Sequence, residues 1–329
     1  MILTIVVPCY NEEEVIVEAT HQFTLLLNRL IASEKISHQS RIAYVDDGSK
    51  DRTWELINGL SESNKFVSGI KLSRNRGHQN AVLAGMMSVS GDAVITIDAD
   101  LQDDISVIEQ MVDEYKSGMD IVYGVRSDRS TDTIFKRNTA QLYYRLLSLF
   151  GVDMIYNHAD FRLMSRRTIE SLREYREVNL YLRGIIPLIG FKSTCLEYSR
   201  KERFAGTSKY PFTKMLKLAV EGVTSFSVVP LQMITYLGFI VFTASFGILT
   251  WVFSVALFTN EAVPGWASTV LPIYFLGGLQ ILCLGVIGSY LGKIYIESKS
   301  RPKYFIEKVI GLPSESATMV NKVKAYDNY

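Results

Sequence analysis

The chain has 329 residues, of which 48 % are hydrophobic and 21 % charged, and its formal net charge is +1. This composition excludes a disordered chain, and the near-neutral charge argues against a dedicated nucleic-acid binder, which usually carries a basic excess. The three cysteines, Cys9, Cys195 and Cys283, are too scattered to form a zinc site among themselves or a disulfide framework.

The first 165 residues alternate between apolar strand-like segments and amphipathic helical segments. The expected strands are Leu3–Cys9, Ile42–Val45, Phe66–Lys71, Ala93–Ile97 and Ile121–Gly124, and the expected helices are Glu12–Ile31, Arg52–Leu60, Gln79–Ser88 and Ile105–Lys116. This alternation predicts an α/β fold with a parallel sheet covered by helices on both faces. Ligands of such sheets bind beyond the carboxyl ends of the strands, so three segments that follow strands are candidate parts of a site.

The first two of these segments have ordinary structural explanations as well as functional ones. Asn11, followed by Glu14, resembles a capping box, and we favour helix initiation there. In the second segment, Asp-Gly is typical of a turn and Asp51 is suited to capping the next helix. The adjacent carboxylates of Asp46 and Asp47 are harder to explain by a turn, because one of them could accept the imide proton of a uracil or a ribose hydroxyl.

The third segment carries four carboxylates within seven residues, at Asp98, Asp100, Asp103 and Asp104. Their mutual repulsion is costly unless solvent or a cation screens it. A solvated acidic helix start, favoured by the helix dipole, accounts for Asp103 and Asp104. A divalent metal holding a diphosphate accounts better for Asp98 and Asp100, because Mg²⁺ and Mn²⁺ prefer oxygen ligands and share them with phosphates.

Two long stretches near the C-terminus, 222–260 and 262–292, contain no charged residue. Each exceeds the roughly 20 apolar residues that a membrane helix needs, and we expect two transmembrane helices near 231–258 and 269–291. Buried helices of a soluble protein are the alternative, but such helices rarely run so far without a charge. The lysines and arginines on the outer flanks place both termini in the cytoplasm, with the tip of the hairpin outside.

The predicted organisation therefore has four parts. Residues 1–209 form an α/β domain, which we expect in the cytosol because no signal peptide precedes the first strand. Residues 210–228 form an amphipathic helix at the membrane interface, unless it packs on the soluble domain. Residues 229–292 form the two membrane helices, in which small residues such as Gly288 and Gly292 suit either a homo-oligomer or packing within one hairpin. Residues 293–329 form a cytosolic tail, polar and loosely ordered from Gly311 onwards.

Four motifs, in this order and spacing, resemble glycosyltransferase family 2. They are Val-Pro-Cys-Tyr-Asn-Glu-Glu at 7–13, Val-Asp-Asp-Gly-Ser-x-Asp-x-Thr at 45–53, Asn75-x-Gly77-His78-x-x-Ala81, and Asp98-Ala-Asp-Leu-Gln. His-Ala-Asp-Phe-Arg-Leu-Met at 158–164, Arg200-x-x-Arg203-x-x-Gly206-x-Ser208-Lys209-Tyr210 and the C-terminal hairpin resemble the polyprenyl-phosphate branch of that family. The resemblance covers roughly residues 1 to 305.

The resemblance implies a GT-A fold, a UDP-sugar donor and Mg²⁺ or Mn²⁺ as cofactor. It assigns nucleotide binding to Pro8, Tyr10, Glu12, Asp46, Asp47 and Asp98, and the metal and diphosphate to Asp98, Asp100 and Gln102. It places Asp160 at the position of the catalytic base. It assigns the phosphates of donor and acceptor to Arg126, Arg200, Arg203, Ser208 and Lys209, which suit phosphate chemically, although Arg200 and Arg203 also suit anionic lipid headgroups.

The implied reaction is an inverting transfer of glucose from UDP-glucose to undecaprenyl phosphate, at the cytosolic face of a bacterial inner membrane. The second pKa of a phosphate monoester is about 6, so the acceptor scarcely needs a base and we expect Asp160 to act largely in positioning. Transfer of mannose, N-acetylhexosamine, galactose or aminoarabinose is an alternative. A processive polysaccharide synthase is disfavoured because its Gln-x-x-Arg-Trp motif is missing, and a non-catalytic membrane scaffold is a distant alternative.

Overall fold

The computed structural model describes residues 1–126, 158–177, 181–199, 229–258 and 266–312. The chain divides into two compact units. One unit combines residues 1–144 and 154–210 with 300–329, and the other contains residues 145–153 and 211–299. The predicted amphipathic helix at 210–228 and the phosphate-binding candidates Arg200, Arg203, Ser208 and Lys209 lie outside the described residues.

The first unit is built on an eight-stranded sheet in the order β7-β5-β6-β4-β1-β2-β3-β8. The strands are β1 Leu3–Cys9, β2 Arg41–Asp46, β3 Val67–Leu72, β4 Ala93–Thr96, β5 Ile121–Arg126, β6 His158–Ser165, β7 Ser193–Tyr198 and β8 Ile306–Ile310. The five strands predicted from the sequence, β1 to β5, run in one direction as expected, and the sheet is mixed because β6 and β8, which were not predicted, run the opposite way. The pairs β1–β2, β1–β4, β2–β3 and β5–β7 are parallel, whereas β6 runs antiparallel to both β4 and β5, and β8 antiparallel to β3.

The reason for the mixed sheet lies in its connections. The crossover from β4 through α4 (Val107–Lys116) to β5 skips one strand position, and β6 fills that gap from the opposite direction. The strand β8 comes from the segment that follows the last long helix, and it closes the other edge of the sheet next to β3. The predicted tail at 293–329 therefore contributes a strand to the first unit, which the sequence did not predict.

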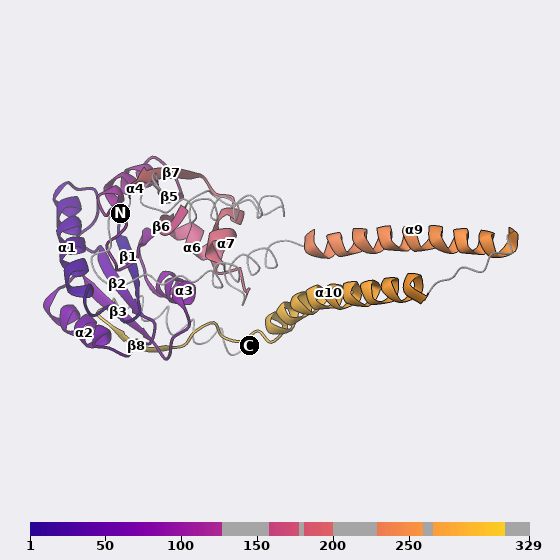
Figure 1. Cartoon of the computed structure of the whole chain (residues 1–329). Helices are drawn as coiled ribbons and strands as arrows, with labels where there is room; N and C mark the ends of the chain where they lie inside the picture. Colours follow the sequence, from indigo (N-terminus) through magenta and orange to yellow (C-terminus); the bar gives the residue numbers. More distant parts are fainter. Residues whose placement is uncertain (127–157, 178–180, 200–228, 259–265, 313–329) are drawn as a thin grey trace. The chain divides into compact units, whose positions relative to one another are not determined.

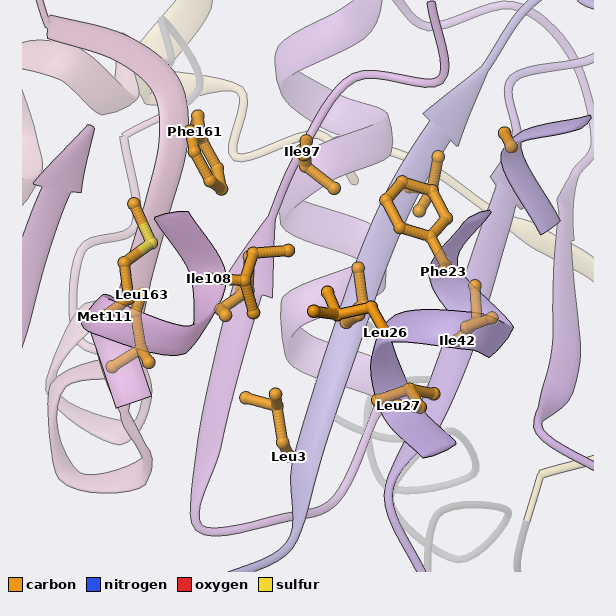
Figure 2. Close-up of a cluster of buried hydrophobic side chains, with 14 of the residues drawn as sticks. Leu3, Phe23, Leu26, Leu27, Ile42, Ile97, Ile108, Met111, Phe161 and Leu163 are labelled. Atoms are coloured by element: carbon orange, nitrogen blue, oxygen red, sulfur yellow. The ribbon is translucent and has the colours of Figure 1, made fainter. Parts of the chain in front are cut away.

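Helices cover both faces of this sheet, as predicted (Figure 1). The helix α1 (Ile16–Ala32), together with α4, buries Phe23, Leu26, Leu27, Ile108 and Met111 in one hydrophobic cluster with Leu3, Ile42 and Leu163 from the strands (Figure 2). On the opposite face, α3 (His78–Ser88) lies close to the strands: a Cβ on its Gly85 would come within 2.4 Å of a methyl group of Val6. Because successive side chains of a strand point to opposite faces, the continuously buried central strands contribute to a core on each side.

The helix starts differ in part from the sequence expectations. The helix α1 begins at Ile16, and Asn11 does not cap it; Asn11 has a positive φ of 55° and its Oδ1 accepts a hydrogen bond from the Lys50 amide. The capping-box interpretation is therefore wrong. Asp51 does hold the first residue of α2 (Thr53–Ser63), because its Oδ1 accepts hydrogen bonds from the amide and hydroxyl of Thr53. The short helices α6 (Arg166–Leu172) and α7 (Leu182–Leu188) were not predicted.

The second unit contains two long helices, α9 (Val229–Phe258) and α10 (Trp266–Ser298), which contact each other. They coincide with the two predicted helical stretches. Within the described residues, the segment Leu279–Ser298 of α10 is long and apolar enough to cross a membrane by length and composition, and α9 contains a shorter apolar stretch, Val229–Val241.

Candidate active site

The carboxyl ends of the parallel strands bring the first two predicted segments together. Cys9 and Asp46 are register partners at the ends of β1 and β2, and the Asp47 amide donates a hydrogen bond to the Cys9 carbonyl. Pro8 lies within the buried strand β1, whereas Tyr10 follows the strand and its side chain is 41 % exposed. Glu12 is half-buried and its amide donates to Thr53 Oγ1 at 2.8 Å, so its backbone is fixed to the start of α2.

The carboxylates of Asp46 and Asp47, hereafter the β2 carboxylate pair, are both buried. Asp46 Oδ1 accepts a hydrogen bond from the Ser49 amide, while its Oδ2 has no hydrogen-bond partner within the described residues. Asp47 accepts two hydrogen bonds, from the Arg76 amide at 2.7 Å and from the Gly77 amide at 2.8 Å. Burial raises the pKa of both carboxyls, against the effect of these hydrogen bonds.

Asp47 thereby fixes the β3–α3 loop, residues 73–77, which leads directly into α3 and His78. Gly77 needs its φ of +88° in this loop, a conformation that glycine adopts at no steric cost. Gly48 makes room for the loop, because a Cβ there would lie 2.6 Å from the Asn75 amide nitrogen. Next to His78, the Gln79 side chain accepts a hydrogen bond from the Leu182 amide at the start of α7. One short segment of chain therefore orients both His78 and α7.

Asp160 on β6 is the centre of a compact charged group, hereafter the Asp160 cluster, which contains Asp160, Arg162, Arg183 and His78. Arg183 of α7 binds Asp160 through two atoms, with Nε at 3.1 Å from Oδ1 and Nη2 at 2.9 Å from Oδ2. Arg162, from the same strand as Asp160 and fully buried, donates to Oδ1 at 2.6 Å. His78 Nε2 lies 3.5 Å from Asp160 Oδ2 and 3.6 Å from Asp98 Oδ1.

These contacts set the charge states of the cluster. Burial alone would raise the pKa of Asp160, but Arg183, His78 and Arg162 outweigh it and hold that pKa well below its usual value. Burial lowers the pKa of His78, yet its hydrogen bond with Asp160 and the charges of Asp98 and Asp160 leave it raised. Asp160 is therefore a carboxylate at neutral pH, and a weak proton acceptor.

The third predicted segment lies beside this cluster, at the end of β4. Burial, followed by the charges of Asp160, Asp103 and Asp100, raises the pKa of Asp98 to about 6, although His78 opposes the shift. Asp100 Oδ1 accepts a hydrogen bond from the Gln102 amide. No group of three or more His, Cys, Asp or Glu side chains is arranged to hold a metal ion within the described ranges.

The interpretation of Asp103 as part of a solvated helix start is wrong. Its side chain is buried, and its Oδ1 accepts a hydrogen bond from the Tyr198 hydroxyl at 2.5 Å and lies 3.4 Å from Arg126 Nη2. The helix α4 starts later, at Val107. Arg126, predicted to face phosphate, is thus placed at the same edge of the sheet through its contacts with Asp103 and Tyr198.

Sequence reasoning gave no role to three residues that the fold brings to the site. His78 stands within a recognised motif, but nothing in the motif shows that it faces Asp160. Arg162 lies two residues after Asp160, and residues i and i+2 on a strand share one face, which is a usable signal. Arg183 carried no signal, because its contact depends on the docking of α7 onto Gln79.

Comparisons with known proteins agree on one family. A family model described as glycosyl transferase family 2 matches residues 4–173, which include β1 to β6. Over 310 residues, the chain is 54 % identical to "Uncharacterized glycosyltransferase YkoT" of Bacillus subtilis (strain 168), covering 93 % of this chain and 91 % of that protein. It is 41 % identical over 312 residues to the "SfII prophage-derived bactoprenol glucosyl transferase" of Shigella flexneri, covering 94 % and 98 %.

A solved structure with a more distant likeness is glucosyl-3-phosphoglycerate synthase from Mycobacterium tuberculosis, in complex with Mn²⁺, uridine diphosphate and glucosyl-3-phosphoglycerate. It is 16 % identical and aligns with 68 % of this chain and 77 % of its own, with a TM-score of 0.42.

Proposed function

Because the chain belongs to glycosyltransferase family 2, we propose that it transfers glucose from UDP-glucose to undecaprenyl phosphate, with inversion at the anomeric carbon. Its mixed α/β sheet is GT-A-like, as the sequence predicted. The observation that carries the proposal is the similarity over nearly the full length to a bactoprenol glucosyl transferase, in a chain whose charged cluster lies at the carboxyl edge of the sheet.

In this proposal, the donor nucleotide lies at the ends of β1, β2 and β4. The exposed ring of Tyr10 suits stacking on the uracil, and Asp46 Oδ2, which lacks a partner among the described residues, suits the imide N–H. Pro8, Glu12, Asp47 and Asp98 complete this region by shaping or lining it. Asp47 serves it by holding the β3–α3 loop, since both of its carboxylate oxygens are already engaged there.

Asp98 and Asp100, with Gln102 nearby, fit a divalent cation of the Mg²⁺ or Mn²⁺ type. The pKa of Asp98 is raised first by burial and then by the nearby carboxylates of Asp160, Asp103 and Asp100, and Mg²⁺ is commonly held by one or two carboxylates together with substrate phosphates. When bound, such an ion stabilises the negative charge of the departing diphosphate. Arg126, and beyond the described residues Arg200, Arg203, Ser208 and Lys209, supply cationic and hydroxyl donors for the phosphates of donor and acceptor.

Asp160 acts in positioning rather than as a base. Its lowered pKa makes it a poor acceptor for a proton, and the lipid phosphate is mostly dianionic at neutral pH because its second pKa is about 6. The acceptor oxygen therefore attacks the anomeric carbon without prior deprotonation. Asp160 holds Arg183 and His78 by direct contacts and so fixes the charges that surround the reacting groups.

We further propose that α9 and α10 form a membrane hairpin with both chain ends in the cytosol, so that the lipid acceptor stays in the bilayer while its phosphate reaches the site. The composition of Leu279–Ser298 supports one crossing, and the charge-free stretch at 222–260 supports the other. Alkaline phosphatase fused after residue 263 should be active in the bacterial periplasm, and the same enzyme fused after residue 312 should be inactive. The opposite pattern would reject this topology.

The central test is a transfer assay with the full-length protein in detergent, radiolabelled UDP-glucose, undecaprenyl phosphate and Mg²⁺ or Mn²⁺. We expect labelled lipid that disappears with EDTA and in Asp100→Ala, but persists in the matched control Asp104→Ala, a neighbouring carboxylate in the turn that precedes α4. Labelling with a different UDP-sugar alone would keep the enzyme class and replace glucose. If no UDP-sugar labelled the lipid while the folded protein bound UDP, the enzymatic proposal would fail in favour of a scaffold.

A further inference from the structure

The segment that contains β8 contacts the loop that carries His78. We define the C-terminal strap as residues 303–311, which follow α10 in the chain and end just after β8. In Figure 1 the strap runs along the outer edge of the sheet beside β3. The transfer mechanism proposed above makes no use of it, and the motifs of the sequence end before it.

The backbone of the strap extends the pairing of β3 into the loop. Leu72, the last residue of β3, pairs with Ile306, and the next residue, Ser73, donates its amide hydrogen to the Phe305 carbonyl at 2.9 Å. The pairing register shifts between Lys71 and Leu72, and the strap stays paired with residues 72 and 73 where β3 ends and the loop begins. The first residue of the β3–α3 loop is therefore anchored to the strap.

The side chain of Phe305 makes a second contact with the loop, in addition to the hydrogen bond that its carbonyl accepts. The Arg76 guanidinium carbon lies 5.9 Å from the centroid of the Phe305 ring, within the range of a cation–π contact. The amide of the same Arg76 donates to Asp47, so the loop is held between Asp47 on one side and Phe305 on the other. His78 follows two residues later.

The strap has its own attachments, which allow it to serve as a support. Lys303 Nζ donates to the Tyr175 carbonyl at 3.2 Å, and Glu307 forms an ion pair with Lys71 at 3.2 Å. At its end, the Gly311 carbonyl accepts a hydrogen bond from Arg41 Nη1 at 3.0 Å. Ile310 packs where Gly69 leaves space, since a Cβ on Gly69 would lie 3.0 Å from it.

We propose that Phe305 is a positioning residue, which stacks on Arg76 and, through the β3–α3 loop, keeps His78 facing Asp160. Its effect on catalysis rests on the proposed glucosyl transfer, whereas its effect on the loop does not. Because the ring is 51 % exposed, its removal disturbs little of the core. A cation–π contact at an exposed site is weak, so its loss should change the loop equilibrium about two- to fivefold.

The test compares Phe305→Ala with the full-length wild type by hydrogen exchange of the amides at 73–79 and by the transfer rate. We expect exchange to become about two- to fivefold faster in this loop and unchanged in α1, with a transfer rate lower by a similar factor. Phe305→Trp, which keeps an aromatic face for Arg76, should restore both values. The matched control is Lys308→Ala, an exposed residue of β8 without this contact.

A double-mutant cycle separates this role from general destabilisation. If Phe305 acts through Arg76, the pair Arg76→Ala and Phe305→Ala should speed loop exchange no more than either single change. Equal loop exchange in Phe305→Ala and Lys308→Ala, or strictly additive effects in the cycle, would overturn the proposal. If the wild type transferred no sugar, the proposed function would be rejected. Faster loop exchange in Phe305→Ala than in the wild type would then still support the positioning role.

Discussion

The β2 carboxylate pair and Asp160 are held by different kinds of hydrogen-bond partner. The β2 carboxylate pair receives its hydrogen bonds from backbone amides, and burial raises the pKa of both members. Asp160 is surrounded by two guanidinium groups and an imidazole, which hold its pKa well below the usual value. The amide donors fix the backbone of a loop to the carboxylate. The cationic partners are instead charged side chains, and the carboxylate fixes where their charges lie.

This difference separates carboxylates that hold the backbone from Asp160, which in the proposed function arranges charge at the reaction site. Asp47 uses both oxygens to hold a loop, so its loss should act on the backbone first. Asp160 links side chains from β6, α3 and α7, so its loss should release charges that come from three elements. The variants below are ordered from the largest expected effect on stability to the smallest.

Asp160→Asn should have the largest effect. It leaves Arg162, which is fully buried, without its counterion, and an uncompensated buried charge costs about 3–5 kcal/mol. We expect a large fall in the thermal unfolding midpoint and a loss of transfer activity of about 100-fold or more, as for other preorganised charges at reaction sites. The wild-type rate should be flat between pH 7 and 8.5, because Asp160 is ionised throughout.

Two further variants keep this prediction testable if Asp160→Asn fails to fold. Arg183→Lys retains the charge but not the two-point contact with Asp160, and it should fold and lose about tenfold in rate. Asp113→Asn, an exposed partner of Lys35, should match the wild type in both measurements. A rate that rises steadily from pH 7 to 8.5 would contradict this prediction and point to His78, whose pKa is raised, as the group that must lose its proton.

Asp47→Ala should have the next largest effect. It removes the acceptors of the Arg76 and Gly77 amides, and unsatisfied buried donors cost about 1–3 kcal/mol. Chemical denaturation of the full-length protein should show this loss, together with faster hydrogen exchange at 73–79. If stability fell while the loop amides stayed protected, Asp47 would not be the residue that fixes the loop.

The sequence was informative where local rules govern structure. The hydrophobic periodicity found β1 to β5 and the helices between them, and the rule that ligands bind at carboxyl ends pointed to Asp46, Asp47, Asp98 and Asp100. The directions of β6 and β8 could not be predicted, because they depend on which strand positions the crossovers leave open. Asp103 was misjudged because the helix-start rule ignored Tyr198 and Arg126, which are distant in sequence.

Asp120→Asn is a matched test outside the site, because Asp120 is also a carboxylate paired with an arginine. It accepts hydrogen bonds from Arg167 and Ser165, and the Arg167 guanidinium lowers its pKa. A lowered pKa in the folded state stabilises the protein above about pH 4 and ceases to do so as the pH falls. The variant should lose little stability at pH 7, since Arg167 is 61 % exposed and an ion pair open to solvent contributes little.

The difference in stability between Asp120→Asn and the wild type should shrink as the pH is lowered through 4, while transfer activity at pH 7 stays unchanged. Thermal unfolding across a pH series measures the first quantity. If a stable Asp120→Asn protein lost activity, breaking an aspartate–arginine pair far from the candidate site would be enough to impair transfer. The effect of Asp160→Asn would then not depend on the position of Asp160 in the site.

Asp46→Asn should leave stability at pH 7 unchanged or slightly higher. A raised pKa in the folded state means that the ionised carboxylate opposes folding above its usual pKa, and a neutral amide removes this cost. The proposed acceptance of the uracil imide predicts a different result for binding. The Asn side chain can turn an N–H toward the imide, and loss of a charged hydrogen bond weakens UDP binding about tenfold or more. Calorimetric titration with UDP measures this directly, and unaltered affinity in a stable Asp46→Asn protein would assign Asp46, like Asp47, to holding the loops of the sheet edge alone.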